Sequence, residues 1–222
     1  MTIIKKEVHK MIKIAPSLLA ADVTELGKQT EMVKLAGAQY LHLDIMDGHF
    51  VPNLSFGPSV VSGLRKVSDL VFDVHLMLSR PDKYIDAFAK AGADIITVHV
   101  ESESNVKECI DKIHSHGIKA GIVFNPDTEV EPYAEYLNYV EMALVMSVYP
   151  GFGGQKFIER VLPKVTLIRQ IKGSDFDIEI DGGINAENAV QAKKAGANVL
   201  VAGSAIFGAK DPAAVIKAMA EK

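Results

Sequence analysis

Short apolar runs rich in β-branched residues recur along the whole chain, and such runs are typical of strands. One of them, Val199-Leu200-Val201, is continuously apolar, which is the pattern of a parallel strand covered on both faces. Between the runs, apolar residues recur at helical spacing, as over residues 23–36, where Asp22 is the predicted N-cap. The pattern predicts eight strands, at residues 13–19, 40–46, 71–78, 95–100, 119–124, 142–148, 177–181 and 198–202.

The link from a helical segment to the next strand repeats an Ala-Gly-Ala tripeptide, at residues 36–38, 91–93 and 195–197. Glycine in this position can end a helix in the left-handed conformation. Alternating strands and helices with short links predict an α/β fold with a parallel sheet. Eight units of about 28 residues account for a single-domain (β/α)8 TIM barrel over residues 11–222, with residues 1–10 as an N-terminal appendage. An open, doubly wound sheet is the structural alternative.

Composition narrows the class of protein. Acidic residues outnumber basic ones by 28 to 24, which argues against nucleic acid as a partner. The single cysteine excludes an intrachain disulfide, and with it a disulfide-stapled secreted fold. No apolar run approaches the roughly 18 residues that a membrane span needs. We therefore expect a soluble cytoplasmic protein that binds neither nucleic acid nor membrane.

Polar side chains gather where the predicted strands end, which is where barrels of this kind carry their active sites. His42 and Asp44 are two residues apart and therefore share a face of their strand. His75 ends the next strand and Asp181 ends the seventh. A lone strand histidine is more often a core residue, but two histidines and two aspartates gathered at the ends of three strands favour one divalent metal ion. Zinc is the first candidate, and iron(II), cobalt and manganese also suit these ligands.

Glycines follow the last three strands. Backbone N–H groups can approach an anion closely at glycine, and barrels often bind phosphate after strands seven and eight. Ordinary turn chemistry explains any one such loop, but three in succession favour a phosphate site. The predicted phosphate-binding residues are Gly151, Phe152, Gly153, Gly154, Gly182, Gly183, Gly203 and Ser204.

A metal, a phosphate site and two opposed aspartates together suggest a reaction. A divalent cation can polarise a carbonyl and stabilise an enediolate. One carboxylate can remove the proton α to the carbonyl, and a second acid can return a proton. If the two acids lie on opposite faces of the substrate, the stereocentre is inverted.

Several motifs resemble those of the ribulose-phosphate 3-epimerase family. The most specific covers residues 41–53, Leu-His-Leu-Asp-Ile-Met-Asp-Gly-His-Phe-Val-Pro-Asn. Similar matches occur at residues 14–19, 73–77, 150–155 and 181–184, so that the resemblance extends from about residue 13 to the C-terminus.

The resemblance implies a ribulose-phosphate-binding barrel that interconverts D-ribulose 5-phosphate and D-xylulose 5-phosphate in the pentose phosphate pathway, as a homo-oligomer. It implies that Asp44 and Asp181 are the acid–base pair on opposite faces of C3 and that both also bind the metal with His42 and His75. It further implies contacts to the substrate from Ser17, His75, Met46, Met77 and Met146.

Some positions stay open. Tyr149 stands where family members often have Asn, which leaves the shape of the following glycine loop unsettled. For His99, a role beside the metal and a purely structural role both remain, with the structural role favoured.

Three rival functions remain. A ketohexose-phosphate epimerase, acting for example on allulose 6-phosphate, would use the same residues. Orotidine-phosphate and hexulose-phosphate enzymes carry an Asp-x-Lys-x-x-Asp strand, whereas the matching residues 42–47 contain no lysine. A non-catalytic binding barrel would lack a catalytic group, whereas both aspartates are present.

Overall fold

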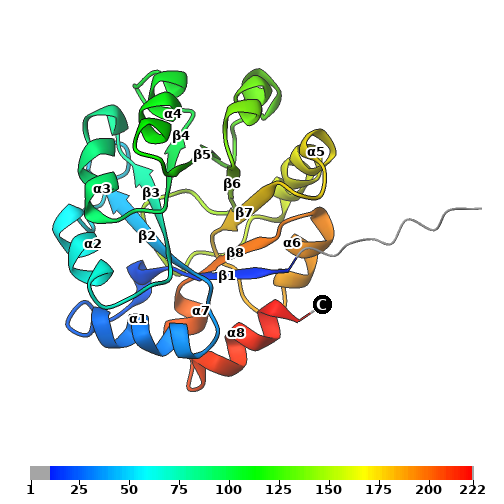
Figure 1. The fold of residues 1–222 in the computed structure, drawn as a ribbon. Coiled ribbons are helices and arrows are strands. Elements are labelled where there is room, and N and C mark those ends of the chain that lie inside the picture. Colours follow the sequence, from blue (N-terminus) through cyan, green and yellow to red (C-terminus); the bar gives the residue numbers. More distant parts are fainter. Residues whose placement is uncertain (1–10, 222) are drawn as a thin grey trace, which may run out of the picture.

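The eight predicted strands form one parallel sheet that curls into a barrel (Figure 1). The structure is a computed structural model and describes residues 11–221, so the predicted appendage at residues 1–10 lies outside the described residues. The strand order is β1-β8-β7-β6-β5-β4-β3-β2, and a parallel bridge between Ser17 and His42 joins the two edges. This confirms the TIM barrel and excludes the open sheet. The strands are β1 (Lys13–Pro16), β2 (Tyr40–Met46), β3 (Val71–Met77), β4 (Ile95–His99), β5 (Lys119–Phe124), β6 (Met142–Met146), β7 (Asp177–Asp181) and β8 (Val199–Ala202).

Helices surround the barrel on its outside (Figure 1). They cover the apolar outer face of the strands, where the main hydrophobic core lies. Between β5 and β6 the connection is a 3₁₀ helix, η3 (Glu131–Tyr139), rather than an α-helix. The α-helices are α1 (Leu26–Leu35), α2 (Pro58–Arg65), α3 (Ile85–Ala91), α4 (Val106–Ser115), α5 (Leu162–Lys172), α6 (Ala189–Ala195), α7 (Ser204–Phe207) and α8 (Pro212–Ala220).

The glycines of the repeated tripeptide end helices as predicted. Gly92 after α3 and Gly196 after α6 have φ angles of 109° and 117°, in the left-handed region. The carbonyl oxygen of Gly196 accepts hydrogen bonds from the Arg169 guanidinium of the preceding helix. A Cβ at Gly92 would lie 2.6 Å from the side chain of Arg65, so a larger residue would push that arginine away.

Two local predictions at the start of the chain are wrong. The first strand ends at Pro16, because the Ser17 hydroxyl accepts a hydrogen bond from the Leu19 N–H and begins a 3₁₀ helix (Leu18–Ala20). Asp22 does not cap α1. Its carboxylate accepts hydrogen bonds from the backbone and hydroxyl of Thr24 instead, and α1 begins only at Leu26.

The interior of the barrel is unusually polar. Barrel interiors are ordinarily filled by apolar side chains, and the lower layer here follows that rule with a small cluster that includes Tyr40, Ile95 and Met142. Above this cluster lie Asp73 and Glu179, each with 0% of its surface exposed. Buried charged groups are costly unless they are paired, so acidic residues in this layer indicate a functional site in the layer above it, at the carboxyl ends of the strands.

Candidate active site and metal centre

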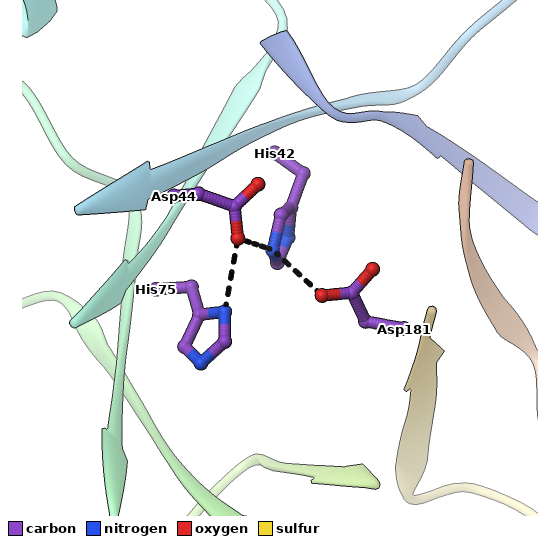
Figure 2. A group of neighbouring side chains, drawn as sticks. All are labelled: His42, Asp44, His75 and Asp181. Atoms are coloured by element: carbon purple, nitrogen blue, oxygen red, sulfur yellow. Dashed lines mark hydrogen bonds and ion pairs between the residues drawn. The ribbon is translucent and has the colours of Figure 1, made fainter. Parts of the chain in front are cut away.

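Four side chains from three strands converge inside the barrel (Figure 2). His42 and Asp44 come from β2, His75 from β3 and Asp181 from β7. The parallel register pairs Asp44 with His75, which brings these two side chains to the same level. One ligand atom from each of the four residues lies within 4.8 Å of the others. The structure thus brings together the four residues that the sequence singled out as metal ligands.

One oxygen of Asp44 is the centre of this group. Its Oδ1 lies 3.3 Å from His42 Nε2 and 3.3 Å from His75 Nδ1. The other oxygen, Oδ2, accepts a hydrogen bond of 2.6 Å from the hydroxyl of Ser17. Asp181 Oδ2 lies 3.8 Å from His42 Nε2, on the opposite side of the barrel from β3. Ser17 therefore orients the carboxylate whose free oxygen faces the two imidazoles.

The donor atoms fit a divalent cation. His42 Nδ1 lies 2.6 Å from Asp73 Oδ2, so its proton is held on Nδ1 and its Nε2 is directed at the group. That Nε2 is buried and has no hydrogen-bond partner among the described residues. Two imidazole nitrogens and two carboxylates are a donor set that suits zinc and other first-row divalent ions.

The environment pushes the pKa values of the two aspartates apart. Burial alone would raise the pKa of Asp44, but the neighbouring imidazoles His42 and His75 outweigh it and hold that pKa well below its usual value. Burial and the Asp44 charge raise the pKa of Asp181 to about 7. Two carboxyl groups whose pKa values diverge in one site are typical of acid–base catalysis.

The two imidazoles also differ. Burial alone would lower the pKa of His42, but the carboxylates of Asp44 and Asp73 raise it well above the usual value. Burial, opposed by the neighbouring Asp44 carboxylate, lowers the pKa of His75 to about 4. His75 is therefore a neutral imidazole at neutral pH, which is the form that binds metal.

A cavity lies above the four residues and contains most of the predicted site. Its walls include Ser17, Asp44 and Asp181, together with the predicted methionines and every predicted phosphate-binding residue. His42 and His75 do not line it, because both side chains are fully buried beside Asp44. The methionines and phosphate-binding residues in the wall are Met46, Met77, Met146, Gly151, Phe152, Gly153, Gly154, Gly182, Gly183, Gly203 and Ser204.

The glycine loops after β6 and β7 pack directly on one another. The Ser147 hydroxyl donates a 2.7 Å hydrogen bond to the Gly182 carbonyl. A Cβ built on Gly183 would lie 2.6 Å from the backbone nitrogen of Phe157 and 2.7 Å from the carbonyl oxygen of Gln155. The close approach explains why glycine is needed at residue 183, where φ is also positive at 66°.

The side chain and the backbone of Tyr149 both form hydrogen bonds. Its hydroxyl donates a 2.6 Å hydrogen bond to Asp127, which also accepts one from Arg160. The Tyr149 side chain is therefore anchored outside the cavity, while its carbonyl accepts a hydrogen bond from the Gln155 amide that also bonds Phe152.

Three acidic residues beside the histidines were missed from the sequence. Asp73 and Glu179 each lie two residues before a predicted ligand, and therefore face the barrel interior. Glu101 lies 3.1 Å from His99, whose other ring nitrogen contacts His75. The signal for Asp73 and Glu179 was an acid at an inward-facing position of a buried strand.

Comparisons with known proteins agree with the geometry. The model of the ribulose-phosphate 3 epimerase family matches residues 13–207. A ribulose-phosphate 3-epimerase of Bacillus subtilis is 50% identical over 205 residues, covering 90% of this chain and 94% of the relative. A chloroplastic ribulose-5-phosphate-3-epimerase of Arabidopsis thaliana is 48% identical over 211 residues, covering 93% of this chain and 75% of the relative.

Solved structures show the same fold. A crystal structure of 3-hexulose-6-phosphate synthase superposes with a TM-score of 0.69 at 21% identity, covering 95% of this chain and 98% of that one. A tryptophan synthase α-subunit of Pyrococcus furiosus superposes with a TM-score of 0.68 at 18% identity, covering 95% of this chain and 98% of that one. In residues 11–221, no helix is long and apolar enough to cross a membrane.

Proposed function

The chain belongs to the ribulose-phosphate 3-epimerase family, and on that premise we propose that it interconverts D-ribulose 5-phosphate and D-xylulose 5-phosphate in a metal-dependent reaction. The observation that carries this proposal is the pair of carboxylates, Asp44 on β2 and Asp181 on β7, at the floor of one cavity. Phosphate-type glycine loops line the wall of the same cavity.

The metal site is formed by His42, Asp44, His75 and Asp181. A divalent cation bound by these residues would supply positive charge beside the substrate carbonyl. Zinc is the ion that we favour for these nitrogen and oxygen donors, and iron(II), cobalt or manganese would also suit them.

Asp44 and Asp181 exchange protons with C3 of the substrate from opposite faces. One carboxylate removes the C3 proton to give the enediolate, and the other carboxyl group returns a proton to the opposite face. Ser17 holds Asp44 in position through its 2.6 Å hydrogen bond, so the carboxylate does not rotate away from the substrate. Inversion at C3 follows from the placement of the two acids.

The remaining walls bind and shield the substrate. Met46 and Met77 lie together with Val51 in one apolar cluster, and Met146 lies in a second with Val148. These polarisable side chains exclude water from the enediolate. The glycine N–H groups after β6, β7 and β8 bind the phosphate, which needs no basic side chain.

The test is an assay of the purified full-length chain with D-ribulose 5-phosphate. We expect D-xylulose 5-phosphate to form, activity to fall to background after treatment with a chelator, and a divalent ion to restore it. Parallel assays with D-allulose 6-phosphate and with unphosphorylated D-ribulose distinguish the pentose phosphate from its rivals. Absence of turnover by the metal-replete enzyme would contradict the proposal. We also expect a homo-oligomer, which size-exclusion chromatography tests. We expect the protein to be located in the cytoplasm.

A further inference from the structure

A chain of two imidazoles and a carboxylate runs from the metal site into the wall of the barrel. His75 Nε2 lies 2.8 Å from His99 Nε2, and His99 Nδ1 lies 3.1 Å from Glu101 Oε2. Both rings are fully buried and stacked, with centroids 5.0 Å apart. Figure 2 shows the Nδ1 of His75 turned toward Asp44 and its Nε2 turned away, where His99 receives it.

The direction of the hydrogen bonds between these three side chains follows from Glu101. An ionised carboxylate can only accept hydrogen bonds, so Glu101 places a proton on His99 Nδ1. A neutral His99 then presents a bare Nε2, which accepts the proton carried by His75 Nε2. Because a neutral imidazole carries one ring proton, His75 Nδ1 is left with a free lone pair that faces Asp44.

The opposite order would disable the site. If His99 donated from Nε2 to His75, the single proton of His75 would lie on Nδ1, directed at Asp44, and this nitrogen could not bind a metal. The opposite order would also set two acceptors, His99 Nδ1 and Glu101 Oε2, 3.1 Å apart. In the favoured order the facing acceptors are His75 Nδ1 and Asp44 Oδ1, at 3.3 Å, and these are the atoms that a bound cation would join.

Glu101 and His99 are themselves held in place. The second oxygen of Glu101, Oε1, accepts a 2.8 Å hydrogen bond from the backbone N–H of Asn125. Burial alone would raise the pKa of Glu101, but its hydrogen bond from His99 outweighs burial and lowers it, so Glu101 is an ionised acceptor. Phe50 packs against the His99 ring with centroids 4.7 Å apart, which fixes the plane of the imidazole.

On the premise of the metal site proposed above, we infer that His99 and Glu101 are positioning residues that set the tautomer of His75 through two successive hydrogen bonds. Neither residue lines the cavity, and neither belongs to the group of four ligand residues. His42 has a shorter version of the same device, since Asp73 bonds its Nδ1 directly. Each metal-binding imidazole is thus oriented by a carboxylate outside the ligand set.

The direct test is nitrogen NMR of the full-length chain with labelled histidine, before and after zinc is added to metal-stripped protein. The chemical shifts of the two ring nitrogens distinguish the tautomers, and His75→Asn and His99→Phe variants assign the signals. We expect His75 to carry its proton on Nε2 and His99 on Nδ1, in both states. A proton on His75 Nδ1 before zinc is added, or a doubly protonated His99, would overturn the inference.

Zinc affinity provides the second readout. We expect Glu101→Gln and His99→Phe to raise the dissociation constant for zinc by about 10- to 100-fold, with a mixture of His75 tautomers in Glu101→Gln. The matched control is Glu141→Gln, because Glu141 also accepts from a histidine ring, His114, and from a backbone N–H, but far from the site. Its zinc affinity should equal that of the unaltered chain.

The outcomes separate this inference from the proposed function. Unchanged zinc affinity in both variants, with an active unaltered enzyme, refutes the positioning role of His99 and Glu101 but leaves the proposed epimerase function standing. An unaltered chain that neither binds zinc nor epimerises refutes the function, whatever the tautomer. If a variant unfolds in urea too readily to be assayed, the tautomers of the unaltered chain still decide the question.

Discussion

Replacing Gly183 by alanine tests the contact between the two glycine loops. The new Cβ would meet backbone atoms of Phe157 and Gln155 at 2.6 and 2.7 Å, and neither can move without displacing the chain after β6. Left-handed backbone costs a non-glycine residue roughly 1 to 2 kcal/mol, and overpacking typically costs about 1 to 3 kcal/mol more. We therefore expect the free energy of unfolding to fall by about 2 to 5 kcal/mol.

Gly117→Ala is the matched control. Gly117 also has a positive φ, of 71°, but its Cβ would have no atom within 4 Å. Only the backbone term applies there, and the free energy of unfolding should fall by about 1 to 2 kcal/mol, as measured by urea denaturation.

The functional effect should be specific to Gly183. Displacing one loop removes N–H groups from the proposed phosphate site, and a hydrogen bond to a charged group contributes about 1.5 to 3 kcal/mol. We expect KM for D-ribulose 5-phosphate to rise by about 10- to 150-fold in Gly183→Ala, with kcat changed less, and to stay unchanged in Gly117→Ala. Equal stability and equal KM in the two variants would refute the described packing of the loops.

Three further predictions concern single side chains. Asp181→Asn should keep its circular dichroism spectrum but lose about 10²- to 10⁴-fold in kcat, whereas the control Asp111→Asn, at an exposed residue, should keep its kcat. Near-normal turnover of Asp181→Asn would show that the acid–base assignment is wrong. Lys13→Met should lose roughly 1 to 3 kcal/mol at pH 7, because Lys13 Nζ pairs with Asp177 at 2.6 Å in a partly buried site. Burial alone would lower the pKa of Lys13, but its hydrogen bonds raise it above 10.5. This stabilisation is therefore complete below pH 10.5 and should vanish as the pH rises through the pKa of the folded state. A difference in urea midpoint between Lys13→Met and the unaltered chain that stays constant up to pH 12 would contradict it. Burial raises the pKa of Cys109 to about 11, so the thiol should resist a thiol-reactive dye at pH 8 until urea unfolds the chain, and rapid labelling of the folded protein would show that the site opens.

Much of the fold could be predicted because each strand carries a local signal. A run such as Val199-Leu200-Val201 is apolar on both faces, and glycines such as Gly92 end helices at regular intervals. The start of α1 could not be predicted, because the Asp22 carboxylate can accept hydrogen bonds either from a helix end or from Thr24, and it bonds Thr24. Both partners are local, so the residue types alone do not decide between them.

Part of the candidate site could also be predicted from the sequence, and part could not. The alternation of strand side chains was enough to place His42 and Asp44 on one face, and barrel closure then determined that Asp181 lies within reach. The hydrogen bonds behind the ligands were not predictable. Whether Asp73 bonds His42, or Glu101 bonds His99, depends on side-chain positions across neighbouring strands that no local pattern specifies.

The central claim is that two acids exchange protons with C3 of a ketopentose phosphate, and solvent isotope incorporation tests it most directly. The zinc-loaded enzyme is incubated with D-ribulose 5-phosphate in D2O, and the sugar phosphates are then analysed by proton NMR and mass spectrometry. The account predicts D-xylulose 5-phosphate with one deuterium at C3, because the proton is removed by one carboxyl group and replaced from another. D-Xylulose 5-phosphate that retains the original C3 hydrogen, or no conversion at all, would contradict it.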